Sequence, residues 1–146
     1  MFHISPASSG PIIFFVVLSL FLIALLGFFG YIIVSAHTAR FDVTEAGLQI
    51  RNTVYGKFIP RQSMDLSNIQ VVNLKTNTDL QAQWRTNGVG LPGYAAGWFK
   101  LKNGEKALVF MTDSEHVLYI PTNLGYAVLL STPDTDKMRD ALMALR

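Results

Sequence analysis

The sequence has no cysteine, and it has no charged side chain before Arg40. The lack of cysteine excludes disulfide bonds, thiolate nucleophiles and metal sites with Cys ligands. All twelve basic and ten acidic side chains lie in residues 40–146, so the chain divides into an uncharged N-terminal third and a polar domain. The net charge of +2 is too small and too dispersed for a nucleic-acid-binding protein, and we expect no nucleic acid partner.

The uncharged third contains a long apolar run from Pro11 to Val34, in which only Ser19 and Tyr31 have polar side-chain atoms. A helix of this length extends about 36 Å, and the hydrocarbon core of a bilayer is about 30 Å thick. A cleaved signal peptide is the alternative, because Val34-Ser35-Ala36 resembles a cleavage site. The run is longer than a signal core, however, and no basic residue precedes it.

We therefore predict a short tail at residues 1–10, a single transmembrane helix at residues 11–35 and a domain at residues 40–146. Arg40 and Arg51 follow the helix, whereas no Lys or Arg precedes it. Basic residues concentrate on the cytoplasmic side of membrane proteins. This bias places the N-terminus outside and the domain in the cytoplasm.

Residues 40–131 predict one strand after another. Short runs that alternate apolar and polar residues, or are apolar throughout, are separated by residues typical of turns. Thr44–Gly47 separates the first two runs, and Asn103-Gly104 separates two later ones. Asn-Gly favours a hairpin with a type I′ turn, in which both central residues need positive φ. Together the runs give about seven strands.

The hydrophobic pattern changes to a helical one near the C-terminus. Ser131 offers a capping hydroxyl, and Pro133 suits the start of a helix. Met138, Leu142 and Leu145 then form one apolar stripe. The predicted fold is mainly β: a small seven-stranded barrel or strongly bent sandwich, capped by one C-terminal α-helix.

Gly88, Gly90 and Gly93 spell G-x-G-x-x-G, the pattern of nucleotide-binding loops. Such a loop leaves a strand and opens directly into a helix, whose N-terminal amides bind the phosphate. Pro92 and Gly97 discourage a helix here, and the domain contains no β-α-β pattern. We therefore interpret the glycines as structural, because they allow positive φ or a close backbone approach in a long connection. Such connections also often contain binding sites.

Several segments resemble bacterial pleckstrin-homology (PH-like) domains. The resemblance rests on GLQIRNTVYGKFIPRQSMDLSNIQVVNL, on RTNGVGLPGYAAGWFKLKNGEKALVFMTD and on STPDTDKMRDAL, and it covers residues 41–145. It implies a seven-stranded barrel capped by a C-terminal helix, attached by an N-terminal anchor to the inner membrane of a bacterium. Eukaryotic phosphoinositide binders of this fold use a basic cluster in the first hairpin, whereas the corresponding turn here, Thr44–Gly47, is acidic.

The chain offers little that suits catalysis or metal binding. His3, His37 and His116 have neither the spacing nor the neighbours of metal ligands. Asp113 and Glu115 lie close together in a turn, where acids are usually solvated rather than catalytic. We therefore expect no enzymatic activity, no metal and no cofactor.

A candidate binding surface lies in residues 85–102 and consists of Arg85, Gly88, Gly90, Gly93, Lys100 and Lys102. Lys100 and Lys102 share one face of a strand, with Lys106 across the hairpin. These cations suit an anionic phosphate or headgroup, although lysines on one strand more often form a solvated sheet face.

Two functional hypotheses follow from this organisation. The leading hypothesis is a membrane-anchored module that binds a protein partner or self-associates. The alternative is a binder of an anionic lipid headgroup or small ligand through the surface at residues 85–102. Trp84, Tyr94 and Trp98 lie around this surface, and we interpret them as core packing and loop anchors rather than as a ligand cage.

Overall fold

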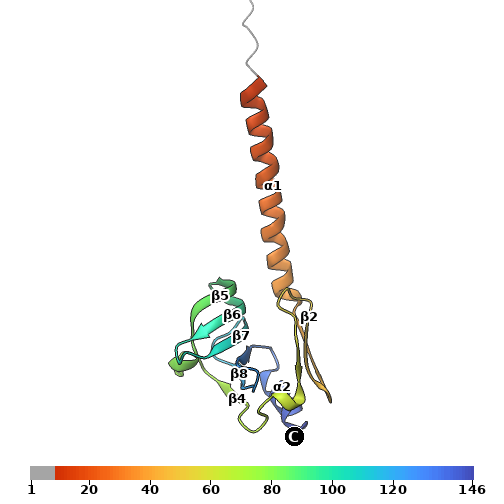
Figure 1. The fold of residues 1–146 in the computed structure, drawn as a ribbon, viewed down its shortest axis with the longest axis vertical. Coiled ribbons are helices and arrows are strands. Elements are labelled where there is room, and N and C mark those ends of the chain that lie inside the picture. The colour runs from red at the N-terminus through yellow and green to blue at the C-terminus, as the bar shows by residue number, and fades with distance from the viewer. Residues whose placement is uncertain (1–8) are drawn as a thin grey trace, which may run out of the picture. The chain divides into compact units, whose positions relative to one another are not determined.

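The computed structural model describes residues 9–146, including every side chain in this range except those of residues 35–38. The chain forms two compact units, Met1–His37 and Thr38–Arg146. The first unit contains one long helix, and the second contains all the strands and a C-terminal helix (Figure 1). His3 and the side chain of His37 lie outside the described residues, as does most of the tail predicted at residues 1–10.

Helix α1, Ser9–Thr38, is apolar on every side. Its stretch Ser9–Val34 is long and apolar enough to cross a membrane, and none of its most apolar part is buried in the structure. The hydroxyl of Ser19 donates a 2.8 Å hydrogen bond to the carbonyl oxygen of Phe15, so this polar group is satisfied inside the helix. The helix is a candidate membrane anchor, and it includes the whole span predicted at residues 11–35.

Nine strands form two separate sheets among the described residues. The three-stranded sheet has the order β1-β2-β3, and the six-stranded sheet has the order β4-β8-β9-β7-β6-β5. Neighbouring strands are antiparallel, except that β7 and β9 pair in parallel. The strands are β1 Arg40–Thr44, β2 Gly47–Arg51, β3 Phe58–Pro60, β4 Gln70–Val72, β5 Ala82–Leu91, β6 Tyr94–Leu101, β7 Lys106–Met111, β8 Val117–Ile120 and β9 Ala127–Leu130.

The main hydrophobic core lies between the two sheets. Leu48 and Ile59 from the three-stranded sheet and Leu118 and Val128 from the six-stranded sheet are all fully buried in it. Side chains alternate between the two faces of a strand, so one face of each strand supplies the core. This arrangement is a sandwich, and the two sheets do not close into a barrel.

A second core covers the other face of the six-stranded sheet. Val109, Leu101 and Leu129 lie in it, and Leu74 and Leu80 cover them from the segment between β4 and β5. This segment includes a short 3-10 helix, Thr78–Leu80. Because both faces of the sheet are covered, all four residues of β9 are buried, and the strand is apolar throughout.

Helix α2, Thr135–Met143, contacts β1, β4 and β8, and it therefore packs against strands of both sheets. Leu142 is fully buried in the main core, and Met138 and Leu145 pack against this core while remaining partly exposed. The predicted apolar stripe and the predicted C-terminal helix are confirmed.

The predicted cap of this helix is wrong. Ser131 Oγ accepts hydrogen bonds from the backbone N–H groups of Thr112 and Asp113, at 2.7 and 3.2 Å. It therefore ties the end of β9 to the end of β7. The helix begins at Thr135, and its N-cap residue Asp134 makes no side-chain capping bond.

The turn at Asn103-Gly104 also differs from the prediction. The hairpin between β6 and β7 forms as expected, but only Gly104 has a positive φ, of 87°. The Gly104 N–H donates to the carbonyl oxygen of Leu101, at 2.9 Å, and Leu101 N–H donates to Glu105. This is the pattern of a longer loop that ends in one left-handed glycine, and not that of a type I′ turn.

Candidate binding surface

The glycines of the G-x-G-x-x-G pattern lie in a regular hairpin of β5 and β6, so the predicted long connection is wrong. Gly88 and Gly97 face each other across the two strands. A Cβ at Gly97 would lie 2.6 Å from the Cα of Gly88, and a Cβ at Gly88 would overlap the carbonyl oxygen of Ala96. The close backbone approach that we expected is therefore confirmed at this pair.

The other two glycines of the pattern have different roles. Gly93 has φ 76° in the two-residue turn that joins the strands, as the sequence interpretation requires. Gly90 has no positive φ, and a Cβ there would make an ordinary 3.7 Å contact with the Phe99 ring. The next element after Gly93 is strand β6, which begins at Tyr94, so the pattern does not open a helix as a phosphate-binding loop does.

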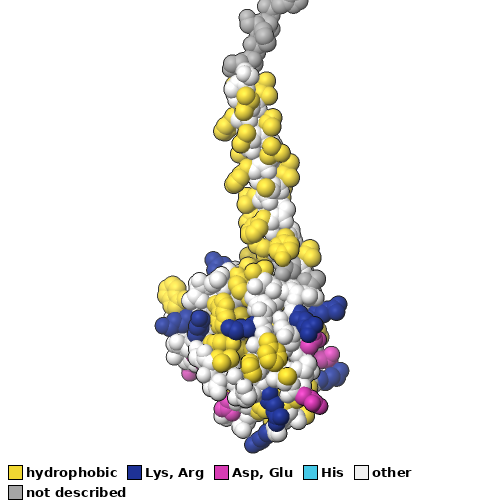
Figure 2. All heavy atoms as spheres, turned by 45° about the vertical axis from the view of Figure 1, so that its right-hand side comes forward, with side chains coloured by type: hydrophobic (Ala, Val, Ile, Leu, Met, Phe, Trp, Pro, Cys, Tyr) yellow, Lys and Arg dark blue, Asp and Glu magenta, His cyan; other side chains and the backbone are white. Residues whose placement is uncertain are grey.

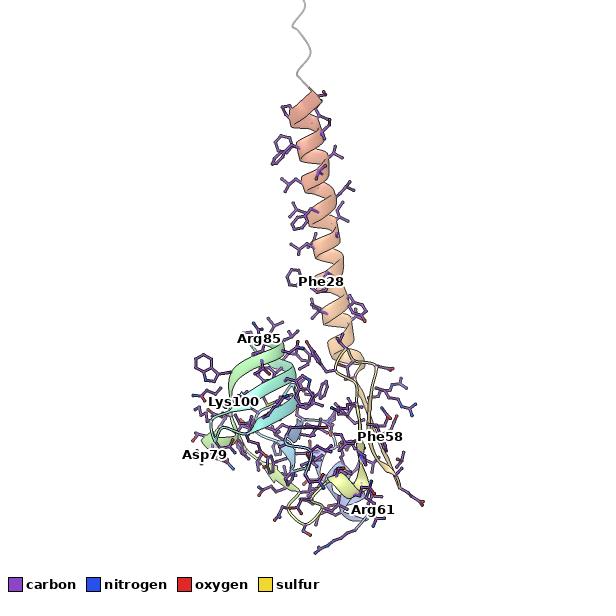
Figure 3. The ribbon with its side chains drawn as sticks, in the orientation of Figure 1. Phe28, Phe58, Arg61, Asp79, Arg85 and Lys100 are labelled. Atoms are coloured by element: carbon purple, nitrogen blue, oxygen red, sulfur yellow. The ribbon has the colours of Figure 1, made fainter. Side chains whose placement is uncertain are left out.

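The strand register places Arg85 and Lys100, which are labelled in Figure 3, on opposite faces of this hairpin. Arg85 pairs with Phe99, whose side chain lies in the second core, whereas Lys100 points to the opposite face. Lys102 lies in the turn beyond β6, and its Nζ donates a 2.6 Å hydrogen bond to Gln81 Oε1. The structure therefore does not bring Arg85 and Lys100 together on one surface.

Aromatic and cationic side chains meet on the Lys100 face of the six-stranded sheet. Trp98 and Tyr126 pack edge to face, with their ring centroids 4.9 Å apart. The Nζ atom of Lys106 lies 4.6 Å from the centroid of the Trp98 ring. Lys57 Nζ, from the loop between β2 and β3, lies 5.3 Å from the Trp98 ring and 5.1 Å from the Tyr126 ring. Each such cation–π contact is worth about 0.5–1 kcal/mol at an exposed site, so the four side chains hold one another in place.

Strand pairing extends this cluster to Lys100 and Trp84. Trp84 pairs with Lys100 across β5 and β6, and Lys100 pairs with Lys106 across β6 and β7. Residues that pair directly point to the same face of a sheet, so the predicted Lys100–Lys106 neighbourhood is confirmed. We call this surface the Lys–Trp face, and it consists of Lys57, Trp84, Trp98, Lys100, Lys106 and Tyr126.

The Lys–Trp face exposes its lysines and Trp84 to solvent, whereas Trp98 is half-buried and Tyr126 is buried beneath them, and the face carries no compensating acid. Trp84 is 65% exposed, so its interpretation as core packing is wrong, whereas Trp98 packs against the main core as expected. The three lysines of the Lys–Trp face are exposed, and none of them forms an ion pair with any acid that the structure describes. The acid next to Lys106 in the sequence, Glu105, is turned to the second core instead, where it accepts a 3.0 Å hydrogen bond from the Tyr119 hydroxyl. Burial and this bond raise the pKa of Tyr119 to about 12.

Sequence reasoning missed Lys57. It lies more than forty residues before Trp98, and its position depends on how the loop after β2 returns over the sheet. A lysine between Gly56 and an apolar strand gives no local signal of this contact.

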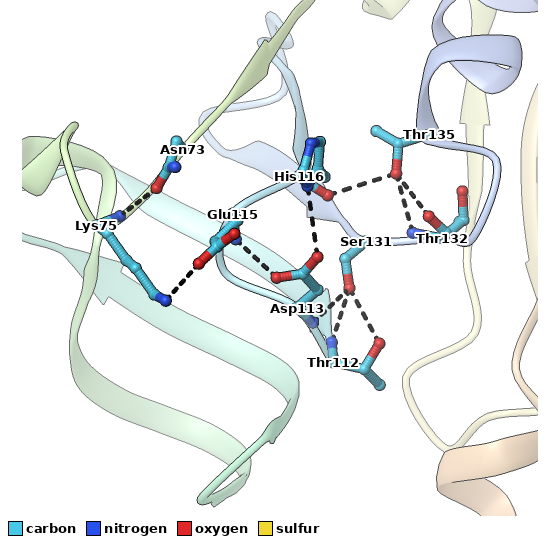
Figure 4. A network of polar contacts seen from close by, with 9 residues as sticks. All are labelled: Asn73, Lys75, Thr112, Asp113, Glu115, His116, Ser131, Thr132 and Thr135. Carbon is cyan, nitrogen blue, oxygen red and sulfur yellow. Dashed lines mark hydrogen bonds and ion pairs between the residues drawn. The ribbon is translucent and has the colours of Figure 1, made fainter.

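A second polar cluster lies around the end of β7, the start of β8 and the start of α2 (Figure 4). A cavity of about 370 Å³ opens there, lined in part by Asp113 and His116, whose Oδ2 and Nδ1 atoms are 3.6 Å apart. The backbone N–H of Glu115 donates to the Asp113 carboxylate and lowers the pKa of Asp113. Thr135 Oγ1 donates a 2.7 Å hydrogen bond to the carbonyl oxygen of Thr132. These groups bond mainly to nearby backbone, and we interpret the cluster as structural.

The described part of the chain contains no group of three or more His, Cys, Asp or Glu side chains arranged to hold a metal ion. His116 is the only histidine whose side chain is described, and it lies beside the single carboxylate of Asp113. The chemistry of the surface is therefore that of its cations and aromatic rings.

Comparison with known proteins identifies the second unit. Residues 39–145 match the profile of the bacterial PH domain, which covers all of the unit Thr38–Arg146 except its first and last residues. No curated protein and no solved structure gives a significant match. Domains of this kind are generally binding modules and not catalysts. A two-sheet sandwich with a C-terminal helix agrees with the profile, and the chain belongs to the bacterial PH domain family.

Proposed function

We propose that the protein is a membrane-anchored, non-catalytic binding module that self-associates by pairing strand β5 of one copy with β5 of a second copy. The observation that carries this proposal is the position of β5. It has ten residues, it lies at the end of the six-stranded sheet, and among the described residues it pairs only with β6. An edge strand presents unpaired backbone N–H and C=O groups to any chain that approaches it.

The outer half of β5 is well suited to pairing. Leu91 and Tyr94 close a two-residue turn, so they form a hydrogen-bonded pair, and the pairs then alternate along the strands. The N–H and C=O groups of Gly90 and Gly88 therefore point away from β6, toward a chain that would add to the sheet. Natural edge strands are often protected by lysine or proline, but β5 has neither, and its only charge is Arg85.

A second copy of the chain is the partner that the anchor favours. A membrane helix holds all copies in one plane and on one side, which raises their effective concentration. Two identical antiparallel strands pair about a twofold axis, which is the commonest symmetry of homo-oligomers. The leading sequence hypothesis is a module that binds a protein partner or self-associates, and this proposal chooses self-association and assigns it to strand β5.

Single cysteines introduced at Asn87, Val89, Gly90 and Leu91 test this pairing in the full chain, and Gly88 is left unchanged because a Cβ there would overlap the Ala96 carbonyl oxygen. The protein has no cysteine of its own, so each introduced thiol can form a disulfide only with a second copy or another protein. A disulfide needs Cβ atoms about 3.5–4.5 Å apart, which only the residues beside the twofold axis satisfy. We expect oxidation in native membranes to give a covalent dimer on non-reducing gels, with a maximum at one position and a decline on both sides.

Two control variants separate pairing from chance collision. Cysteine at the exposed Ser67, outside the strands, should give little dimer. In a chain that carries the best-crosslinking cysteine, Gly90→Pro removes an outward N–H and should abolish the dimer, whereas Gly90→Ala keeps the N–H and should not. Equal crosslinking at Ser67 and in β5 would exclude the proposal, and adducts of a different size would replace the second copy with another protein.

We further propose that the anchor spans the bacterial inner membrane once, with the N-terminus outside and the PH domain in the cytoplasm. Support comes from Arg40 and Arg51 after α1 and from the lack of Lys and Arg before it. Alkaline phosphatase fused after Arg146 should be inactive, and a fluorescent protein fused there should be fluorescent. The variant Ser9→Lys adds a positive charge before the helix, so a fraction of the chains should insert in the reverse orientation. In this variant the phosphatase activity should rise and the fluorescence should fall. An active phosphatase in the wild-type chain would reverse the topology.

A further inference from the structure

We propose that the Lys–Trp face docks on the surface of an anionic lipid bilayer, with Trp84 in the headgroup region. This inference goes beyond self-association, because it concerns a face of the sheet and not the edge of β5. It keeps the anionic lipid headgroup of the alternative sequence hypothesis, but it assigns the binding site to the Lys–Trp face instead of Arg85 and the glycines.

The first argument is uncompensated charge. Lys57, Lys100 and Lys106 lie on one face and have no acidic partner among the described side chains. Elsewhere in the domain, Lys75 pairs with Glu115, and Lys137 pairs with Asp134 at 2.9 Å. In Figure 2, dark blue cationic side chains lie beside yellow hydrophobic ones on the visible face of the domain. Lysines without counterions attract an anionic surface by about 1 kcal/mol each.

The second argument is the exposed tryptophan. At 65% exposure, Trp84 is the most exposed aromatic side chain described in the domain. Its partner across the strands is Lys100, so an indole and a lysine side chain start from neighbouring positions on one face of the hairpin. Tryptophan is enriched at the membrane–water interface, where its ring lies at the level of the headgroups. Lipid phosphate groups would therefore attract the Lys100 ammonium group, while the membrane–water interface would accommodate the Trp84 ring.

The third argument is the proximity of lipid. Helix α1 ends at Thr38 and strand β1 begins at Arg40, so one residue joins a helix long enough to span a bilayer to the PH domain. A short connection keeps the effective concentration of lipid around the domain high. The first hairpin, in contrast, turns at Thr44–Gly47, which contains Glu45 and no cation. The charge of the domain thus favours the Lys–Trp face over that turn.

The test uses the full chain reconstituted in vesicles that contain phosphatidylcholine brominated in its acyl chains. The two tryptophans of the protein are Trp84 and Trp98, and the variant Trp84→Phe isolates Trp98 so that the signal of Trp84 is obtained by difference. We expect the bromines to quench Trp84 when phosphatidylglycerol is added to the vesicles. We expect little quenching in phosphatidylcholine alone, and loss of quenching at high salt.

Paired variants decide whether the Lys–Trp face is responsible. Lys57→Gln/Lys106→Gln should shift the docking equilibrium roughly thirtyfold toward the free domain, and the conservative pair Lys57→Arg/Lys106→Arg should restore it. The control Lys75→Gln/Lys137→Gln removes the same charge from paired lysines and should leave the quenching unchanged. Equal quenching with and without phosphatidylglycerol, equal losses in both glutamine pairs, or no quenching of Trp84 would each overturn the proposal. Since β5 crosslinking is measured separately, failure of docking leaves self-association intact.

Discussion

Alanine at Gly97 is expected to lower the free energy of unfolding of the PH domain by about 2–6 kcal/mol. Gly97 has φ 115°, a conformation that costs a residue with a Cβ about 1–3 kcal/mol. The new Cβ would also lie 2.6 Å from the Cα of Gly88 and 3.1 Å from the Tyr55 ring, so β5 and β6 would have to separate. Domains are stable by only about 5–15 kcal/mol, so this one methyl group removes a large part of the total.

The remaining glycines of the same hairpin provide graded controls. Gly88→Ala should approach the effect of Gly97→Ala, because its Cβ would overlap the Ala96 carbonyl oxygen. Gly93→Ala meets no atom within 4 Å but has φ 76°, and should cost about 1 kcal/mol. Gly90→Ala has neither problem and should change stability by less than about 0.5 kcal/mol. Denaturant unfolding of the full chain, followed by tryptophan fluorescence, measures the series. An equal loss at Gly90 and Gly97 would contradict the structural interpretation of the pattern.

The same glycines explain why one strand escaped prediction. Residues 82–91 contain two glycines, Asn87 and several polar side chains, which are depleted in strands or neutral there. Most of β5 is solvent-exposed, so it shows no apolar alternation, and what makes it a strand is its pairing with β6. The strands that were predicted correctly, such as β7 and β9, carry buried apolar side chains that mark them in the sequence. A run of apolar residues in the sequence indicates a buried strand, but no residue pattern indicates an exposed edge strand that forms by pairing with its neighbour.

The candidate surface shows the same division between local and distant information. Asn103-Gly104 predicts a hairpin, and this hairpin places Lys100 opposite Lys106. This pairing could therefore be predicted from the sequence. The separation of Arg85 from Lys100 depends on the register of β5, which has irregularities near Trp84 and Asn87 that no residue type signals. The contact of Lys57 with the Trp98 ring depends on the path of a distant loop. The exact composition of the surface therefore required the fold.

Alanine at Leu142 is expected to destabilise the domain by about 2–5 kcal/mol, although the residue lies in the last helix of the chain. Leu142 is fully buried in the main core, and α2 contacts β1 from one sheet and β4 and β8 from the other. Removing this side chain leaves a cavity at the place where helix and sheets meet, and a packed core relaxes only partly into such a cavity. The loss should therefore appear in the unfolding of the whole domain, and not only in the helix.

Substitutions along the same helix and two spectroscopic signals test this point. Leu142→Met keeps most of the volume and should cost less than about 1.5 kcal/mol, while Lys137→Ala removes only an exposed ion pair and should cost about 0.5 kcal/mol or less. In a Trp84→Phe background, fluorescence reports Trp98, which packs against the main core, and circular dichroism reports the backbone. In Leu142→Ala both signals should move together to lower denaturant. If the helical signal were lost first while Trp98 unfolded at its original midpoint, α2 would be an appendage, and the core would be complete without it.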